Sequence, residues 1–236
     1  MNYAIFKDYE EMSTSAAEII IQEVNENPDL FIGISAEVNF RRVLEILVDQ
    51  YLLGHVDFSK CRFAIMYEWM GTSTYEDGSC NQFLYKEFFS KVNIKAAQLV
   101  LFNGKSEKPN KECKRIDKDI INYGDLDLVL LTMGADCNIE FIRPNSYFSC
   151  YSHVRRIGSK HYLDHYASQT RPAAYLVGNK HILGAKEVIV LADGLQKAPI
   201  IKKTLKDNFH LHIQKKAFHR NITFLLDQEA SSLLHT

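Results

Sequence analysis

Along this chain, segments with hydrophobic residues at helical spacing alternate with short, continuous hydrophobic runs. This alternation predicts that helices and strands follow one another. Apolar residues at helical spacing are typical of helices that pack by one face, and short apolar runs are typical of buried strands. The predicted helices span Thr14–Val24, Phe40–Leu53, Asn81–Phe89, Asn110–Tyr123 and Ala198–Asp207. The predicted strands span Leu30–Ile34, Cys61–Tyr67, Leu99–Phe102, Asp127–Thr132, Tyr147–Val154, Val188–Leu191 and Ile222–Leu226.

The first two helices give the most detailed local predictions. Ser13, Thr14 or Ser15 is expected to cap the first helix, because such side chains accept hydrogen bonds from first-turn amides. The second helix is expected to bury Leu52 and Leu53 with its other apolar side chains, and to end at Gly54.

The succession of strands and helices predicts an α/β fold. The run from Leu126 to Leu131 is almost continuously apolar, which is typical of a parallel strand covered on both faces. We therefore expect one three-layer, Rossmann-like domain over residues 1–236, with a mostly parallel sheet and helices on both faces.

Composition and charge narrow the class of protein. The chain has 236 residues, of which 46% are hydrophobic, and its 28 basic and 29 acidic residues give a net charge of −1. This balance supplies no field to attract nucleic acid, and the lysines at 202, 203 and 206 are interpreted as a solvated face. No apolar run approaches the roughly 20 residues that span a bilayer, and the N-terminus lacks a signal-peptide pattern. We expect a cytoplasmic protein that binds neither nucleic acid nor membrane.

Five cysteines are widely spaced and form no C-x-x-C pair, which favours reduced thiols over a disulfide or zinc framework. His161 and His165 stand four residues apart, but no third metal ligand accompanies them, so a polar helix face is the simpler interpretation. The sequence therefore predicts neither a metal nor another cofactor.

The strongest candidate for chemistry follows the predicted strand that ends at Thr132. In open α/β sheets, ligands bind beyond the carboxyl ends of strands, which here means the loop from Met133 to Asn138. Gly134, Asp136, Ile139, Phe141 and Pro144 fit the pattern G-x-G-x-D-G-H-I-A-F-N-E-P. This loop resembles that of the glucosamine-6-phosphate deaminase (isomerase) family and its 6-phosphogluconolactonase relatives.

The resemblance places two replaced residues in this loop. The family's ring-opening histidine falls on Asn138, and the glutamate that supports it falls on Arg143. An amide does not cycle a proton near neutral pH, and a guanidinium does not replace a carboxylate.

A second segment, Phe63 to Gly71, is similar to the family's F-N-M-D-E-Y-V-G strand end. By this resemblance the aspartate that takes the substrate's proton falls on Tyr67, whereas Glu68 keeps the neighbouring acid. A tyrosine has an ordinary pKa of about 10 and is a poor base at neutral pH. Both matching segments have therefore lost proton-handling residues.

The remaining segments concern phosphate binding. The family's glycine-rich phosphate loop falls on Ser35 to Asn39, which has no glycine and includes the acidic Glu37, although Ser35 is still able to donate a hydrogen bond. The G-x-x-K-A motif is kept, so Lys197 is the expected phosphate contact, with His161 near the position of its arginine partner.

Three functional hypotheses follow from the sequence. The first is a deaminase-like pseudoenzyme of amino-sugar metabolism that binds a sugar phosphate or acts through contacts in a homo-oligomer. The second is an active isomerase, deaminase or lactonase in which Glu68 or Asp136 is the base and Arg143 with Lys197 holds the anion. The third is an interaction protein whose pocket is filled by Val38, Tyr67 and Trp69.

Overall fold

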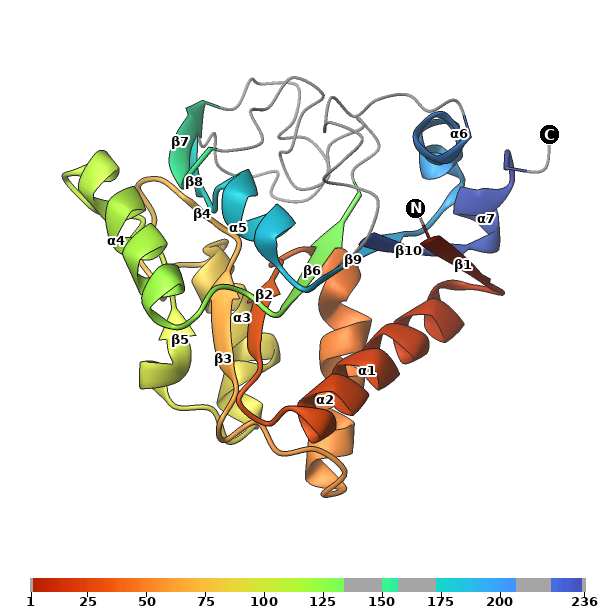
Figure 1. Ribbon diagram of the computed structural model, residues 1–236, viewed down its shortest axis with the longest axis horizontal. Helices are drawn as coiled ribbons and strands as arrows, with labels where there is room; N and C mark the ends of the chain where they lie inside the picture. The colour runs from red at the N-terminus through yellow and green to blue at the C-terminus, as the bar shows by residue number, and fades with distance from the viewer. Residues whose placement is uncertain (1, 134–149, 157–172, 207–221, 235–236) are drawn as a thin grey trace.

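The computed structural model describes residues 2–133, 150–156, 173–206 and 222–234, and its centre is a seven-stranded sheet (Figure 1). Every neighbouring pair in this sheet is parallel, and the strand order is β1-β10-β9-β6-β2-β3-β5. The strands are β1 (Asn2–Phe6), β2 (Phe31–Ile34), β3 (Arg62–Ile65), β5 (Leu99–Val100), β6 (Leu128–Thr132), β9 (Glu187–Ala192) and β10 (Ile222–Asp227).

Helices cover both faces of the sheet, as Figure 1 shows. One face packs against α1 (Tyr9–Glu26), α2 (Arg41–Leu52) and α3 (Cys80–Glu87), and the other against α4 (Pro109–Asn122), α5 (Asn179–Gly184), α6 (Ala198–Leu205) and α7 (Gln228–Ser231). Side chains alternate along each strand, so Ile32 and Ile34 join the first core and Phe31 joins the second. The predicted three-layer α/β fold with a mostly parallel sheet is confirmed.

A second, three-stranded antiparallel sheet consists of β4 (Tyr67–Trp69), β8 (Ala173–Leu176) and β7 (His153–Arg156). The predicted strand over Cys61–Tyr67 is therefore wrong as a single unit, because β3 ends at Ile65 and the chain then enters the other sheet. In the new sheet Leu176 lies opposite Tyr67 on one side and opposite His153 on the other. The turn away from the main sheet moves Tyr67 beyond the end of β3.

Several local predictions about helices need correction. Helix α1 begins at Tyr9 and is capped by Asp8, whose carboxylate accepts a hydrogen bond from the Glu11 amide at 2.9 Å. The serines and threonine predicted as caps lie inside the helix. At the end of α2, Leu52 and Leu53 are 70% and 65% exposed, so they are not part of the core.

The sequence analysis also missed four short elements: β1, β8, α5 and α7. The predicted strand over Tyr147–Val154 overlaps the structure only in β7, since residues 150–152 are not in a strand and residues 147–149 lie outside the described ranges. No helix in the described ranges is both long and apolar enough to span a bilayer.

Parallel pairing gathers the carboxyl ends of the central strands at one edge of the sheet. Ser35 follows β2, Met133 follows β6 and Asp193 follows β9, and these three strands are neighbours. Gly33 lies in β2 and faces the core on the α4–α7 side of the sheet. An added side-chain carbon there would lie 2.7 Å from the Met66 sulfur, so glycine allows β2 to pack at this point.

Candidate functional site

The loop after β2 lies against the first residue of β4. The Ser35 amide donates a hydrogen bond to the Leu130 carbonyl at 3.2 Å, and its buried hydroxyl has no hydrogen-bond partner among the described residues. Two residues later, Glu37 accepts a 2.8 Å hydrogen bond from the hydroxyl of Tyr67. The buried Tyr67 ring also makes an edge contact with Trp69, with centroids 6.0 Å apart. Contacts of both its hydroxyl and its ring thus fix the side chain of Tyr67.

Lys197 lies at the same edge, beyond β9. It follows a turn in which Gly194 has a φ of 84°, a conformation that favours glycine, and the Gly194 amide donates to Asp227 at 2.9 Å. The ammonium of Lys197 is 2.6 Å from a carboxylate oxygen of Asp193, and the side chains of the pair are only 4% and 23% exposed. Lys197 is therefore a buried cation with a counterion from its own chain.

Asn39 connects the two parts of the site. Its side-chain amide donates at 2.9 Å to the same Asp193 oxygen that pairs with Lys197. The backbone carbonyl of Asn39 in turn accepts a hydrogen bond from the Tyr9 hydroxyl at 2.8 Å. The structure thus brings the segment Ser35 to Asn39 and Lys197 together, while their predicted role in phosphate binding stays a prediction.

The described residues of this edge carry more negative than positive charge. Lys197 carries one positive charge, while Glu37 and Asp193 each carry a negative one. A phosphate at Lys197 would therefore lie near two carboxylates, whose repulsion opposes the attraction of the ammonium. Arg143 and His161, the other cations expected at an anion site, lie outside the described residues.

Glu68 is engaged elsewhere. Its buried carboxylate accepts five hydrogen bonds: from the amides of Trp69, Cys80 and Asn81 and the hydroxyls of Thr72 and Ser79, at 2.7 to 3.2 Å. Ser79 is also the N-cap of α3, because its hydroxyl accepts from the Gln82 amide. Glu68 therefore ties the end of β4 to the amino end of α3.

Several predicted site residues lie outside the described residues. Asp136, Asn138 and Arg143 belong to the loop after β6, and His161 and His165 belong to a later segment. The roles expected of them stay predictions. Of the residues within the described ranges, Ser35, Tyr67 and Lys197 lie along the carboxyl edge, while the Glu68 carboxylate is bound to the amino end of α3.

The sequence analysis missed the partners of the retained residues. Asp193 precedes Lys197 by four residues but lies outside the helical turn Leu195–Lys197, beyond Gly194 with its φ of 84°, so helical spacing alone does not predict this pair. The Tyr67–Glu37 contact joins residues 30 apart and depends on how β2 and β4 meet. No local pattern in the sequence predicts that contact.

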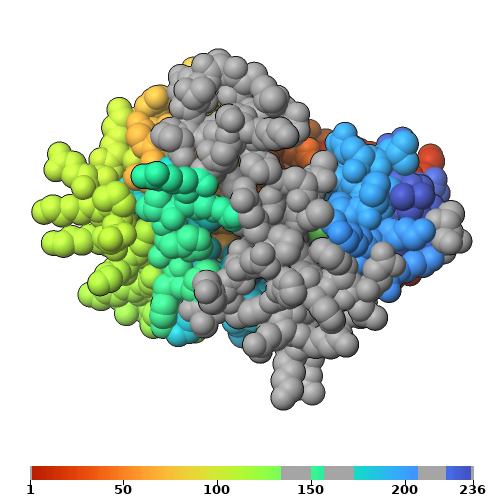
Figure 2. Space-filling view, turned by 90° about the horizontal axis from the view of Figure 1, so that it is seen from above, coloured from red at the N-terminus to blue at the C-terminus, as the bar shows by residue number. Residues whose placement is uncertain are grey.

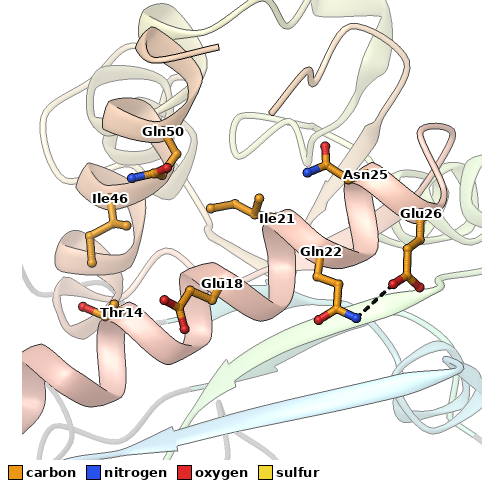
Figure 3. Close-up of a pocket in the computed structure, with 8 residues that line it drawn as sticks. All are labelled: Thr14, Glu18, Ile21, Gln22, Asn25, Glu26, Ile46 and Gln50. Carbon is orange, nitrogen blue, oxygen red and sulfur yellow. Dashed lines mark hydrogen bonds between the residues drawn. The ribbon is translucent and has the colours of Figure 1, made fainter. Parts of the chain in front are cut away.

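A groove of about 480 Å³ lies elsewhere, between the outer faces of α1 and α2 (Figure 3). Its lining combines polar side chains with two isoleucines, and the residues are Thr14, Glu18, Ile21, Gln22, Asn25, Glu26, Ile46 and Gln50. These positions run toward the carboxyl ends of the two helices, away from the edge that carries Ser35 and Lys197. None of the predicted site residues lines this groove.

Comparisons with known proteins cover nearly the whole chain. The family model for glucosamine-6-phosphate isomerases/6-phosphogluconolactonase matches residues 7–217. A glucosamine-6-phosphate deaminase of Thermoanaerobacter sp. (strain X514) is 29% identical over 99% of this chain and 95% of its own length. One from Clostridium novyi (strain NT) is also 29% identical, over 99% and 100% of the two chains.

Solved structures give the same picture. A monomeric glucosamine-6-phosphate deaminase superposes with a TM-score of 0.91 at 25% identity, covering 99% of this chain and 100% of the other. A 6-phosphogluconolactonase from Leishmania guyanensis has a TM-score of 0.78 at 18% identity and 97% coverage of both chains, which supports the fold alone.

Proposed function

The chain belongs to the family of glucosamine-6-phosphate isomerases and 6-phosphogluconolactonases, and from this premise we propose that it is a member that has lost ordinary deaminase turnover. The family places it in carbohydrate metabolism. In the proposed function, the protein keeps the deaminase-like architecture and the position of Lys197, the expected phosphate contact. The ammonium of Lys197 is, however, already paired with the carboxylate of Asp193. The protein then acts as a pseudoenzyme of amino-sugar metabolism.

The observation that carries this proposal is the hydrogen bond from Tyr67 to Glu37. In the family resemblance, Tyr67 stands where an aspartate removes the substrate proton. A phenol that donates to a carboxylate at 2.8 Å still carries its proton, so it is an acid in that contact and a poor base at neutral pH. The expected replacements at Asn138 and Arg143 act in the same direction, since neither side chain cycles a proton.

The ion pair of Lys197 with Asp193 supports weak binding of sugar phosphates. Lys197 is the residue that the resemblance assigns to the phosphate, yet its ammonium is buried and compensated at 2.6 Å. A ligand phosphate at Lys197 competes with Asp193 for the ammonium and is repelled by that carboxylate. Affinity for the anion is therefore expected to depend on Asp193.

The contacts of Glu68 argue against the rearranged enzyme that is the main alternative. A base at Glu68 has to accept a proton, but five donors already surround its carboxylate. Proton uptake there would turn an acceptor into a donor facing other donors. Asp136 stays the remaining candidate for a base in that alternative.

The burial of two aromatic side chains supports the interaction-protein alternative. Tyr67 and Trp69 are 1% and 6% exposed and belong to the core on the α1–α3 side of the sheet. Large buried rings at the strand end reduce the room for a hexose. A protein that binds no sugar phosphate, with or without Asp193, is the outcome expected from this alternative.

Two measurements on the full chain test the proposal. The first follows ammonia release from glucosamine 6-phosphate, for which we expect no turnover above the uncatalysed reaction. The second is calorimetric titration with glucosamine 6-phosphate and with inorganic phosphate for the natural chain and for Asp193→Asn. The substitution frees the Lys197 ammonium, so affinity for both anions should rise roughly tenfold, the equivalent of about 1.4 kcal/mol.

The matched control is Asp119→Asn, which removes one carboxylate that pairs with Arg115 on the surface of α4. It changes the net charge equally and should leave phosphate affinity unchanged. Ammonia release at an ordinary enzymic rate would overturn the proposed loss of turnover. Absence of turnover without any gain in affinity in Asp193→Asn would instead overturn the role given to Lys197 and favour the filled pocket.

A further inference from the structure

The outer face of α4 carries a row of exposed lysines. Lys111, Lys114 and Lys118 follow one another at steps of three and four residues, which places them along one side of the helix, opposite its buried residues. None of the three side chains forms an ion pair or a hydrogen bond with another described residue. We call these three residues the basic stripe, which extends about 10 Å along the helix axis.

The acidic residues of α4 do not neutralise the basic stripe, because other groups already engage each of them. Arg115 pairs with Glu112 at 2.5 Å and with Asp119 at 2.7 Å. Asp117 is buried and accepts a hydrogen bond from the Ser152 amide at 2.9 Å. The outer face of α4 therefore carries net positive charge, although the whole chain has a net charge of −1.

An apolar residue continues the basic stripe. Ile121 is 50% exposed and lies three residues beyond Lys118. Positions 111, 114, 118 and 121 thus alternate steps of three and four, which is the spacing at which one helix contacts another. Figure 2 shows side chains of α4 projecting outward at one end of the molecule. The outer face of α4 therefore has the residue spacing of a packing surface, together with charge and one apolar contact.

The groove between α1 and α2 has the opposite charge. Its lining includes Glu18 and Glu26 and contains no lysine or arginine. Glu18 has no ion-pair or hydrogen-bond partner in the ranges that the structure describes, and Glu26 uses one of its two carboxylate oxygens to accept a 2.9 Å hydrogen bond from Gln22. The two glutamates are eight residues apart, or about 12 Å along α1, which is close to the length of the basic stripe.

Two isoleucines make part of the groove apolar. Ile21 on α1 and Ile46 on α2 are half-buried members of its lining, and Figure 3 shows the Ile21 side chain pointing from α1 toward α2. The groove encloses about 480 Å³, which holds several side chains but not a whole helix of roughly 10 to 12 Å diameter. Lysine side chains fit such a groove, because their methylene stems pack on apolar groups while their ammonium groups reach carboxylates.

We propose that the basic stripe of one copy of this chain docks on the α1–α2 groove of a second copy. The core on one face of the sheet contains α1 and α2, and the core on the other face contains α4, so one chain does not bring its own two surfaces together (Figure 1). The groove is an acidic surface of matching length that the same chain supplies. Lysine ammonium groups of one copy pair there with Glu18 and Glu26 of the next, and Ile121 adds an apolar contact.

The proposed contact joins two different surfaces, so each copy offers its basic stripe to one neighbour and its groove to another. Such heterologous contacts continue as a chain of copies or close into a ring. Opposite charges orient the copies and make the contact sensitive to salt. One helix face on one groove is smaller than the interface of a stable dimer, which buries roughly 1,600 Å². The association should therefore be weak and visible only in concentrated protein.

Sedimentation velocity of the full chain over a range of concentrations tests the proposal. At low salt we expect the sedimentation coefficient to rise with concentration, and at about 1 M salt, where the screening length is about 3 Å, to stay at the monomer value. Lys111→Glu with Lys118→Glu reverses the basic stripe, Glu18→Lys with Glu26→Lys reverses the groove, and each pair of changes should abolish the rise. The chain with all four changes keeps the natural net charge of −1 and again has opposite charges on the two surfaces, so its association should return.

Lys86→Glu with Lys95→Glu is the matched control. Both lysines are exposed and lie outside α4 and the groove, so this pair changes the net charge as the reversed stripe does and should leave association unchanged. Thermal unfolding checks that each variant keeps the fold. A natural chain that stays monomeric at every concentration in low salt would overturn the proposal, as would association that survives either reversal or fails to return with all four changes. These outcomes are independent of whether the protein turns over a sugar phosphate.

Discussion

Two regions of the molecule, one at β4 and one beyond β9, bury a charged side chain to nearly the same depth but compensate it in different ways. In the corner at the amino end of α3, Glu68 is 1% exposed and accepts five hydrogen bonds from uncharged donors. At the carboxyl edge, Lys197 is 3% exposed and is paired with the carboxylate of Asp193. The α3 corner keeps the charge of its buried residue, whereas the carboxyl edge cancels it.

This difference indicates that Glu68 supports the fold, whereas Lys197 lies where a ligand is expected. Uncharged donors from β4, from the connection that follows it and from the first turn of α3 satisfy Glu68, so the corner works as a structural joint whatever the ligand. A counterion at Lys197 stabilises the buried ammonium but removes the charge that an anionic ligand would use. The family's fold is present, and the altered chemistry that we propose concerns the edge where a ligand is expected.

The largest effect should follow from Glu68→Gln, which tests whether the α3 corner is the structural joint. The amide keeps the shape of the side chain but turns one acceptor oxygen into a donor that faces other donors. Leaving buried amides and hydroxyls without an acceptor costs about 1 to 3 kcal/mol for each group lost. We expect the free energy of unfolding in urea to fall by roughly 3 kcal/mol.

Glu107→Gln is the control for that measurement, because Glu107 is exposed and the same chemical change should there cost almost nothing. If Glu68→Gln proved as stable as the natural chain, the corner would not be the joint described, and Glu68 would be available for proton transfer. The result also bears directly on the rearranged-enzyme alternative.

Much of the fold was predictable because the main strands and helices carry strong patterns. The continuous apolar run that became β6 and the amphipathic helix α4 appear in the structure within a residue or two of their predicted bounds. Short elements were missed for physical reasons. β8 has the sequence AAYL, which lacks β-branched residues, and it is stabilised by its neighbours β4 and β7 rather than by its own propensity.

The site was predictable only in part. The family resemblance pointed to Tyr67 and Lys197, and both lie beyond the carboxyl ends of strands in the main sheet. Sequence patterns did not predict that Tyr67 bonds Glu37, nor that Asn39 and Lys197 share one carboxylate oxygen of Asp193. Such contacts depend on which strands are neighbours, and sheet order is a property of the whole fold.

A second, smaller effect should come from Lys197→Met, which breaks the ion pair at the carboxyl edge. Among the residues that the structure describes, the change leaves Asp193 the Asn39 amide as its hydrogen-bond partner. Removing one member of a buried pair is costly, but Asp193 is partly exposed, so we expect a loss of about 2 kcal/mol in unfolding free energy.

The double variant Lys197→Met with Asp193→Leu should recover most of that loss, because replacing a whole buried pair with apolar side chains is often neutral. The sum of the two single changes and the double variant form a thermodynamic cycle, measured by urea unfolding. Strictly additive costs would mean that Lys197 and Asp193 do not stabilise each other, and the contrast with the α3 corner would fail.

The smallest effect should come from Tyr67→Phe, one residue away from Glu68 in the chain. The phenylalanine keeps the ring contact with Trp69 and removes only the hydroxyl that donates to Glu37. Because Glu37 is half-buried and regains water as a partner, we expect a loss of about 1 kcal/mol. Tyr175→Phe is the matched control, since that buried tyrosine makes only a 3.4 Å contact with a carbonyl and should lose less.

If Tyr67→Phe cost as much as Glu68→Gln, both residues of β4 would serve the joint. The contact between Tyr67 and Glu37, which follows β2, would then belong to the joint together with Glu68.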